Sequence, residues 1–407
     1  MKKLLKLISL LMALLILLCS SFAENIPAEK TTDEAAFIQA NEERALSAFK
    51  LLCRYSCDEI NVYSTVNSFE KESEAWKMLR DFDGGWFSSV DRQTFENLRT
   101  DNWEIVSDTE FCVDVYGDYT MRVKALYESI TYSAAWHFCF RQTDADKDLW
   151  HVYDFHILEN TEDQPRAEKF ALENEGITME TVIGKTFTGY MMIVDDPTRV
   201  FVGCIEKFGV KTGGLYIHEL VEQFDALGGI NGGGFSEASG GSSSPSGIVI
   251  TMGEMRQKHS YANPVTGIVM GFDENDKLVV GSFTREEVDQ LKLRDALGFG
   301  PALIIDGEAV DTGDERDDLS IRTAIGQDKD GRVLMLVTRG RQPDSLGANM
   351  KDLIEIMLSY GAVNAGNLDG GNSTCMYLNG ESVYSGFRLE TSRKIPAGFL
   401  IKKLPAE

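Results

Sequence analysis

The stretch that most constrains the fold lies near the C-terminus, at residues 363–377. It reads Val-Asn-Ala-Gly-Asn-Leu-Asp-Gly-Gly-Asn-Ser-Thr-Cys-Met-Tyr. An amphipathic helix is expected just before it, over residues 350–358, and Gly361 ends that helix because glycine turns left-handed without steric cost. A short strand over residues 362–368 then ends at Asp369. This order predicts an acidic side chain where a strand stops and the backbone bends sharply.

Small and polar residues line the predicted bend. Gly370 and Gly371 allow a ligand to approach the backbone closely, and Ser373 and Thr374 supply short hydroxyl groups. An acid in such surroundings is suited to binding a polar substrate. The pattern alone leaves open the alternative of a tight Asp-Gly turn that has no chemical role.

Two further stretches repeat this design. Residues 228–235 read Gly-Gly-Ile-Asn-Gly-Gly-Gly-Phe and follow a helix expected over residues 218–226, so Asn231 ends a short strand. Residues 322–326 read Arg-Thr-Ala-Ile-Gly and open a hairpin that ends near residue 338. Each stretch places a polar side chain at the end of a strand beside glycines or small residues.

The order and spacing of these motifs resemble the phosphodiester glycosidase family. The resemblance rests on residues 230–233, Gly300-Pro301, residues 322–326, Gly340-Arg341 and residues 367–371, and it covers roughly the last 230 residues. It implies hydrolysis of the bond between a sugar anomeric carbon and a phosphodiester oxygen, of the N-acetylglucosamine-1-phosphodiester type. The chain is therefore predicted to be a hydrolase.

This resemblance implies chemical roles for individual residues. An oxocarbenium-like transition state requires a nearby carboxylate, and Asp369 is the candidate nucleophile or base. Arginine binds phosphate through two parallel N–H bonds. The candidate catalytic residues are Asp369, Arg322 and Asn231. The candidate substrate-binding residues are Gly232, Gly233, Arg341, Asn367, Gly370, Gly371, Ser373 and Thr374.

Structural roles remain open for several of these residues. Asn231 as a cap of its own turn, Asn367 as a buried strand amide and Arg341 as a solvated side chain are the alternatives. The sequence also departs from the family pattern, which usually has an aromatic residue, a glycine and an acid at the positions of Gly234, Asn372 and Arg339, respectively. The first two changes alter the pocket, and the third replaces a carboxylate by a positive charge.

Alternatives remain open for the cofactor and for the class of function. No cofactor is required by the motifs, but Asp369 could bridge a divalent cation, because oxygen ligands suit calcium or magnesium. A zinc site is not expected, because no Cys-x-x-Cys or His-rich pair occurs. The alternative function is a non-catalytic module that binds phosphorylated wall or extracellular polysaccharide. A phosphodiesterase that cuts the P–O bond is disfavoured by the lack of clustered His and Asp ligands.

The N-terminus predicts export. Lys2, Lys3 and Lys6 give the start of the chain a positive charge, and residues 4–18 form an almost unbroken apolar run. Ser21-Phe-Ala23 then offers small residues for cleavage after Ala23. Lipidation of Cys19 is the weaker alternative, because Leu18 before it is large. The mature protein is therefore expected to be secreted or at the cell surface, with the signal peptide as its only membrane contact. The net charge of −24 argues against binding of nucleic acid.

Between the signal peptide at residues 1–23 and the chain end, two units are expected, and the fold class is α+β. Residues 24–165 predict helices and then an antiparallel meander with strands over 103–116, 119–132, 134–141 and 150–158, an order that resembles a nuclear transport factor 2-like (cystatin-like) roll. Residues 166–180 are the predicted linker, and residues 181–404 the mixed α/β phosphodiester glycosidase domain. Seven cysteines in 407 residues are too sparse for a disulfide framework.

Overall fold

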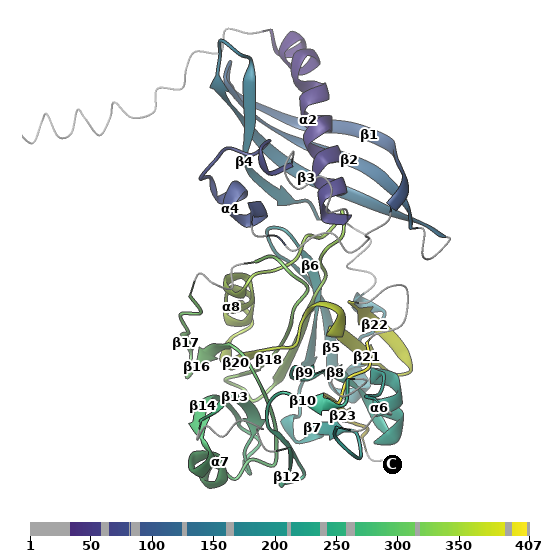
Figure 1. The fold of residues 1–407 in the computed structure, drawn as a ribbon, viewed down its shortest axis with the longest axis vertical. Coiled ribbons are helices and arrows are strands. Elements are labelled where there is room, and N and C mark those ends of the chain that lie inside the picture. Colours follow the sequence, from purple (N-terminus) through teal and green to yellow (C-terminus); the bar gives the residue numbers. More distant parts are fainter. Residues whose placement is uncertain are drawn as a thin grey trace, which may run out of the picture.

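The computed structural model describes residues 33–57, 65–80, 82, 90–123, 128–159, 167–209, 213–236, 242–257, 265–313, 318–386 and 393–404. The predicted signal peptide and its cleavage site lie outside this range. Two units are stacked along the long axis of the molecule (Figure 1). No helix in the described ranges is long and apolar enough to cross a bilayer.

The N-terminal unit packs helices against one antiparallel sheet. Helices α2 (Glu34–Cys57) and α4 (Glu74–Arg80) precede strands β1 (Val90–Ser107), β2 (Glu110–Val123), β3 (Glu128–Asp144) and β4 (Leu149–Ile157), which pair in chain order. Phe49 and Leu52 of α2 are fully buried against Trp136 and Phe138 of β3 and Phe155 of β4. The predicted order of helices and then a meander is therefore present, while the likeness to a cystatin-like roll stays a prediction.

The fourth predicted strand, 150–158, agrees with β4 to within one residue, but the bounds of the first two predicted strands were wrong. The sequence suggested a turn at Gly117-Asp118, but Gly117 lies inside β2, and the first turn comes at residues 108–109. A side chain at Gly117 would lie 2.6 Å from Leu98 Cδ2 and 3.1 Å from Phe49 Cε1. This glycine is therefore required by the packing of α2 on the sheet, and it does not mark a turn.

One disulfide is present in the described residues. Cys112 of β2 and Cys139 of β3 are directly opposite each other, with their Cα atoms 4.1 Å apart. Cys53, Cys57, Cys204 and Cys375 are buried and lie outside this disulfide. The expectation that cysteines form no framework holds for these four, and the exception is a local cross-strand link that sequence spacing could not reveal.

The C-terminal unit is built from three main antiparallel sheets. The largest has the order β17-β16-β20-β18-β19-β6-β5, the second β22-β21-β8-β23-β7, and the third β12-β11-β15-β13-β14. In chain order the strands are β5 (Ile177–Ile183), β6 (Thr188–Val194), β7 (Val200–Cys204), β8 (Ala226–Asn231), β11 (Val249–Thr251), β12 (Glu254–Gln257), β13 (Val265–Phe272), β14 (Leu278–Thr284), β15 (Asp295–Phe299), β16 (Ala302–Ile305), β17 (Glu308–Ala309), β18 (Thr323–Asp328), β19 (Val333–Thr338), β20 (Ala362–Leu368), β21 (Cys375–Leu378), β22 (Glu381–Ser385) and β23 (Ala397–Lys402). Short strands β9 (Phe235–Ser236) and β10 (Ser244–Pro245) form a separate ribbon.

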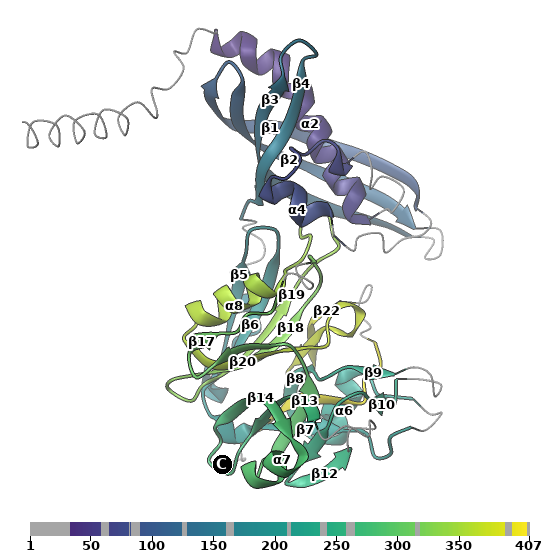
Figure 2. The ribbon, with the colours of Figure 1, turned by 60° about the vertical axis from the view of Figure 1, so that its left-hand side comes forward.

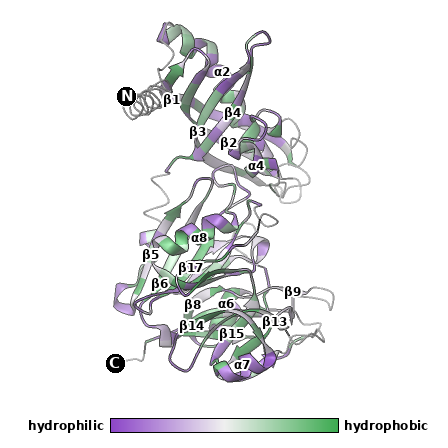
Figure 3. Ribbon diagram, turned by 90° about the vertical axis from the view of Figure 1, so that its left-hand side faces the viewer, coloured by the Kyte–Doolittle hydropathy of each residue, from purple (hydrophilic) through white to green (hydrophobic). Residues whose placement is uncertain are grey.

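Helices α6 (Ile217–Gln223), α7 (Arg285–Leu291) and α8 (Met350–Ser359) flank these sheets. Strands therefore outweigh helices in this unit, and the predicted mixed composition is confirmed at that coarse level. Figures 2 and 3 show the sheets stacked as layers, with hydrophobic residues along the inner strands and hydrophilic residues on the outside of α7.

The boundary between the units differs from the predicted linker at 166–180. Strand β5 begins at Ile177, and Ala167 and Phe170 are buried in the core of the C-terminal unit. Residues 160–166 lie outside the described ranges. The described part of the predicted linker thus belongs to the C-terminal unit, because Ala167 and Phe170 pack in the hydrophobic core of that unit.

Candidate functional site

Local sequence signals place Asp369 at the end of β20. Asn349 caps α8 by accepting a hydrogen bond from the Asp352 backbone N–H at 2.9 Å. Gly361 then has a φ of 77°, which ends the helix as predicted. Strand β20 is central in the largest sheet, between β16 and β18, and Asp369 follows its last residue.

The Asp369 carboxyl group is largely buried, and burial raises its pKa above the ordinary value of 3.8. A hydrogen bond from the Ser373 hydroxyl, the charge of Arg393 and a hydrogen bond from the Gly370 backbone N–H act in the opposite direction on this pKa. Desolvation dominates over these three effects. The pKa of the Asp369 carboxyl group is therefore raised, and a group with a perturbed pKa at a glycine-rich bend is a candidate for acid–base chemistry.

Asn231 binds the backbone of Asp369. It is fully buried, and its Nδ2 donates to the Asp369 carbonyl oxygen at 2.6 Å. Its Oδ1 accepts from the Thr323 hydroxyl at 2.9 Å and from the Cys375 backbone N–H at 3.0 Å. Asn231 thus ties together strands β8, β18 and β21 around the bend, and these contacts make it a positioning residue.

The backbone amides of the bend are mostly occupied within the protein. The N–H of Gly371 donates to Ile321 O at 2.8 Å, and the N–H of Ser373 donates to Gly370 O at 3.1 Å. The N–H of Thr374 donates to Gly371 O, because residues 371–373 form one turn of 3₁₀ helix. These three amides are therefore committed to the turn. The roles of Gly370 and Gly371 in substrate binding stay predictions, and the Gly371 N–H is already used within the turn.

Arg341 lies beside the bend. A Cβ atom on Gly371 would be 3.7 Å from its Nη1, so the guanidinium and the Gly371 backbone are neighbours. The Arg341 backbone has a φ of 56°. The structure therefore brings the predicted phosphate ligand to the predicted bend.

Arg322 has protein partners on two of its nitrogens. Its Nε donates to the Ala348 carbonyl at 3.1 Å, and its Nη2 donates to the Asp318 carbonyl at 2.7 Å and carboxylate at 3.0 Å. Its side chain is 13% exposed. These contacts tie the residues before β18 to those before α8, which is a supporting role next to the site.

The predicted glycines of residues 232–234 are explained by close packing. A Cβ on Gly232 would be 2.7 Å from Ala397 O, and a Cβ on Gly233 would be 2.3 Å from Gly298 O. Gly232 O also accepts the hydrogen bond of the Asp369 N–H at 3.0 Å. A side chain at Gly234 would meet the Phe299 ring at 2.5 Å, so Phe299 occupies the space of the aromatic side chain that the family usually has here.

Two buried acceptors near Asp369 in the sequence have no donor in the structure. They are the Oδ1 atoms of Asn367 and Asn372. Asn367 is 3% exposed, and its Nδ2 donates to Gly300 O at 2.8 Å. A buried amide oxygen without a donor is costly, and a substrate hydroxyl group would remove that cost. Thr374 and Ser373 complete the polar lining, although the Thr374 hydroxyl oxygen already lies 3.1 Å from that of Thr323, within hydrogen-bond distance.

Arg393 is a site residue that the sequence analysis missed. Its charge acts on the Asp369 carboxyl group, and its guanidinium lies over the Phe235 ring, 5.0 Å from the centroid. It follows Thr391-Ser392 just before β23 and has no glycine motif around it. The only signal was a basic pair, Arg393-Lys394, in an acidic chain.

The departure at Arg339 is compensated locally. Its Nη2 donates to the Asp344 carboxylate at 2.5 Å and to Gln342 Oε1 at 3.1 Å, and its Nη1 donates to the Thr188 hydroxyl at 2.9 Å. Asp344 therefore neutralises the charge that Arg339 introduces. The positive charge that was predicted at position 339 is therefore balanced by the negative charge of Asp344.

The described residues of the bend supply one carboxylate to a cation. This carboxylate is Asp369, and the positive charge of Arg393 acts on it. In the described ranges, three clustered His, Cys, Asp or Glu ligands occur at Cys112, His137 and Cys139, in the N-terminal unit. Two of these are joined in the disulfide, and His137 Nδ1 lies 2.6 Å from Asp114 Oδ1. Calcium or magnesium at Asp369 would therefore depend on oxygen ligands from the substrate.

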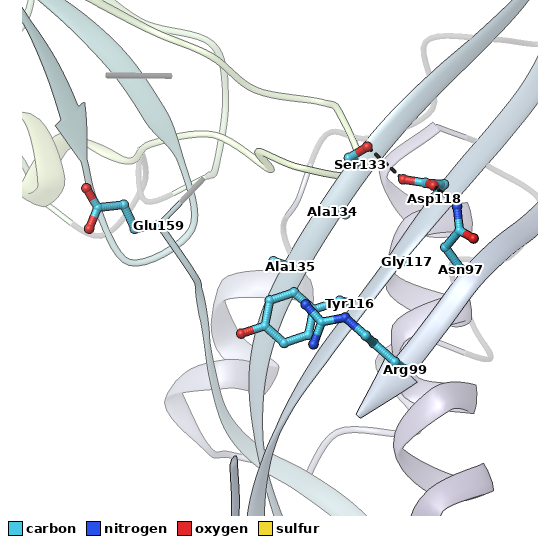
Figure 4. Close-up of a pocket in the computed structure, with 9 residues that line it drawn as sticks. All are labelled: Asn97, Arg99, Tyr116, Gly117, Asp118, Ser133, Ala134, Ala135 and Glu159. Carbon is cyan, nitrogen blue, oxygen red and sulfur yellow. Dashed lines mark hydrogen bonds between the residues drawn. The ribbon is translucent and has the colours of Figure 1, made fainter. Parts of the chain in front are cut away.

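A separate hollow lies on the N-terminal sheet (Figure 4). Its volume is about 470 Å³, and residues of β1, β2 and β3 together with Glu159 line it. The Arg99 guanidinium lies over the Tyr116 ring, 3.7 Å from the centroid, and Asp118 accepts hydrogen bonds from Ser133 and Asn97, both at 2.6 Å. Several of its polar groups are thus paired with one another, and its lining residues precede the C-terminal unit in the chain.

Comparison with known proteins supports the family resemblance. Residues 224–402 match the family model described as phosphodiester glycosidase. The bovine and human N-acetylglucosamine-1-phosphodiester alpha-N-acetylglucosaminidases are each 42% identical over 62 residues, which is 15% of this chain and 12% of the length of each relative. The predicted resemblance is therefore confirmed over the region that contains Asn231 and Asp369.

Solved structures also align with this chain. The zebrafish N-acetylglucosamine-1-phosphodiester alpha-N-acetylglucosaminidase catalytic domain, auto-inhibited by its pro-peptide, has a TM-score of 0.46 at 20% identity and covers 56% of this chain and 82% of that one. A hypothetical protein from Synechocystis has a TM-score of 0.41 at 15% identity, with 76% and 81% covered.

Proposed function

We propose that this chain hydrolyses a sugar-1-phosphodiester, of the N-acetylglucosamine-1-phosphodiester type, in cell-surface or extracellular glycans. The observation that carries this proposal is the buried Asp369 carboxyl group with its raised pKa, set at the bend beside Arg341 and within the influence of Arg393. The match of residues 224–402 to the phosphodiester glycosidase family supports the reaction class.

The reaction adds water across one bond. The bond between the anomeric carbon and the phosphodiester oxygen breaks, water supplies the new anomeric hydroxyl group, and the second product is a phosphomonoester. Asp369 stabilises the developing positive charge on the sugar as carboxylate, acting as nucleophile or as base. The leaving phosphate is a weak base, so it needs charge stabilisation more than a strong acid. Arg341 and Arg393 supply that positive charge.

The sugar is bound by polar groups near Asp369. The Oδ1 atoms of Asn367 and Asn372 are buried acceptors without a donor, and sugar hydroxyl groups are donors of the right kind. Ser373 adds a hydroxyl group that already contacts Asp369. Asn231 and Arg322 act through the residues that they hold in place.

Product analysis tests the reaction. Wild-type protein is incubated with a sugar-1-phosphodiester, and the products are identified by chromatography and mass spectrometry. Free sugar plus a phosphomonoester is the expected result. A sugar phosphate plus an alcohol would show P–O cleavage and would overturn the proposal. Binding of phosphorylated polysaccharide without any product would instead identify a non-catalytic module.

We also propose that the chain is exported and cleaved after Ala23. The basis is the sequence of residues 1–23. Intact-mass measurement of protein isolated from its native host should give a chain that starts at Glu24 without modification. A mass that includes diacylglyceryl on Cys19 would contradict this cleavage.

A further inference from the structure

The segment between β19 and α8 belongs to the C-terminal unit and also contacts the N-terminal unit. We refer to residues 339–348 as the arginine hairpin, because it contains Arg339 and Arg341. Gln342 and Ser345 exchange backbone hydrogen bonds of 3.0 Å in both directions, so that Pro343 and Asp344 form the tip of a tight turn. In Figures 1 and 2 this part of the chain rises from the C-terminal unit toward the N-terminal one.

The tip of the arginine hairpin is bound by the N-terminal unit. The indole Nε1 of Trp136, on β3, donates to the Pro343 carbonyl oxygen at 2.8 Å. Trp136 is fully buried. This hydrogen bond joins residues 207 positions apart in the sequence, and it is made in a dry environment, where losing the donor leaves the carbonyl unpaired.

The same unit also buries a leucine from the base of the hairpin. Leu346 has no exposed surface and belongs to the hydrophobic cluster of the N-terminal unit, which includes Trp136. The Leu346 carbonyl oxygen accepts the hydrogen bond of the Arg341 backbone N–H at 2.8 Å. Two contacts therefore lead from the N-terminal core to Arg341, and the Arg341 guanidinium lies beside Gly371 in the bend.

A second leucine links the core of the N-terminal unit to Arg322 in the same way. Leu319 is also fully buried in the N-terminal cluster. Its neighbour Asp318 is the ion-pair partner of Arg322, and Arg322 Nε donates to Ala348 at the end of the arginine hairpin. Both segments that carry an arginine toward the site thus insert one leucine into the core of the other unit.

From these contacts we propose that the N-terminal unit is a structural part of the C-terminal site, and that Trp136, Leu319 and Leu346 are positioning residues for Arg341 and Arg322. This inference rests on the proposed function. It predicts that Arg341 reaches the substrate phosphate only while the tip of the arginine hairpin stays bound to β3. The N-terminal unit then contributes to substrate binding without touching the substrate.

The test uses the full chain and two variants, Trp136→Phe and Leu346→Ala, with Trp150→Phe as matched control. Trp150 lies on the adjacent strand, and its indole N–H donates to Asp148 rather than to the hairpin. Hydrogen exchange of the Arg341 and Leu346 amides should become at least tenfold faster in both variants and stay unchanged in the control. Unchanged exchange in both folded variants would overturn the proposal, whether or not the protein is active.

Kinetics with a sugar-1-phosphodiester supply the second readout. Trp136→Phe should raise KM about tenfold with kcat within about twofold, because binding shared by the ground state and transition state appears in KM. In an Arg341→Ala background the same change should have no further effect on KM, since residues that act through one another are not additive. An equal effect in both backgrounds would refute positioning through Arg341. A wild-type protein without activity would instead refute the proposed function, and the exchange experiment would still decide the placement of the hairpin.

Discussion

Replacement of Asp369 by asparagine separates a catalytic role from a structural one, because the two roles predict opposite changes in stability. Asparagine has nearly the same shape, and its amide oxygen can accept the hydrogen bond of the Gly370 N–H or the Ser373 hydroxyl group, as the carboxylate does. What is lost is the negative charge. If that charge stabilises an oxocarbenium-like transition state, turnover should fall about 10³-fold, which corresponds to roughly 4 kcal/mol in activation free energy.

The stability of this variant follows from the direction of the pKa shift. Burial raises the pKa of Asp369 in the folded protein above 3.8, so the ionised carboxylate costs stability in the fold. That cost is absent below the unfolded pKa and complete above the folded pKa. Asp369→Asn should therefore melt at a higher temperature than the wild type at pH 7, and the difference should vanish as the pH falls below about 4.

The assay combines steady-state release of sugar with thermal melts from pH 3.5 to pH 8. Asp306→Asn is the matched control, because Asp306-Gly307 is also an Asp-Gly pair at a strand end, with φ values of 50° and 85° in an exposed turn. Asparagine tolerates this conformation, so the control should behave like the wild type in both measurements. Turnover of Asp369→Asn near the wild-type value would falsify the catalytic assignment. A lower Tm at pH 7 would show that Asp369 is a scaffold residue of the turn.

Four further outcomes follow from the site. The value of kcat/KM should decrease as the pH falls through the raised pKa of Asp369, so the acidic limb of the pH profile should lie above the ordinary aspartate value of 3.8; a limb at or below this value would contradict the assignment. Asn372→Gly removes a buried oxygen that has no donor, and it should leave the Tm unchanged or higher while raising KM several-fold; an unchanged KM would mean that the oxygen faces no substrate group. Asn231→Ala leaves three buried partners unsatisfied, and urea unfolding should show a loss of about 3 kcal/mol or more. Activity should survive dialysis against a chelator, because Asp369 is the single carboxylate at the bend; loss of activity that calcium or magnesium restores would establish a cation bridge.

The elements around Asp369 could be predicted closely because their signals are local. Helix α8 and strand β20 were expected from apolar spacing and from the glycine between them, and the structure places β20 at the predicted residues. Asn379 and Gly380 both have positive φ values, as their hairpin turn requires. Signals of this kind depend on the conformations that a few neighbouring residues can adopt, and tertiary contacts reinforce them.

Predictions that depended on distant contacts were less successful. Gly117 looked like a turn residue, yet Phe49 of α2 requires a glycine there inside a strand. Arg393 had no motif, although its charge acts on Asp369. Arg322 was expected to face the substrate, but Asp318 and the Ala348 carbonyl bind two of its nitrogens. In each case the deciding neighbour lies on another element, and nothing in the residue's own segment identifies that neighbour.

The contacts between the two units were also impossible to predict from local sequence signals. Leu319 lies between Asp318 and Ser320, and Leu346 lies between Ser345 and Gly347, in short segments for which the sequence predicted no helix or strand. These leucines are buried by side chains of the N-terminal unit, which include Trp136. The strand that contains Trp136 could be predicted from the sequence, but the hydrogen-bond partner of its indole could not. A domain boundary inferred from composition separates units that could fold independently, but it does not show which side chains cross between them. Because the crossing residues here adjoin the two candidate arginines, removing the N-terminal unit would expose two buried leucines and release the hairpin that carries Arg341.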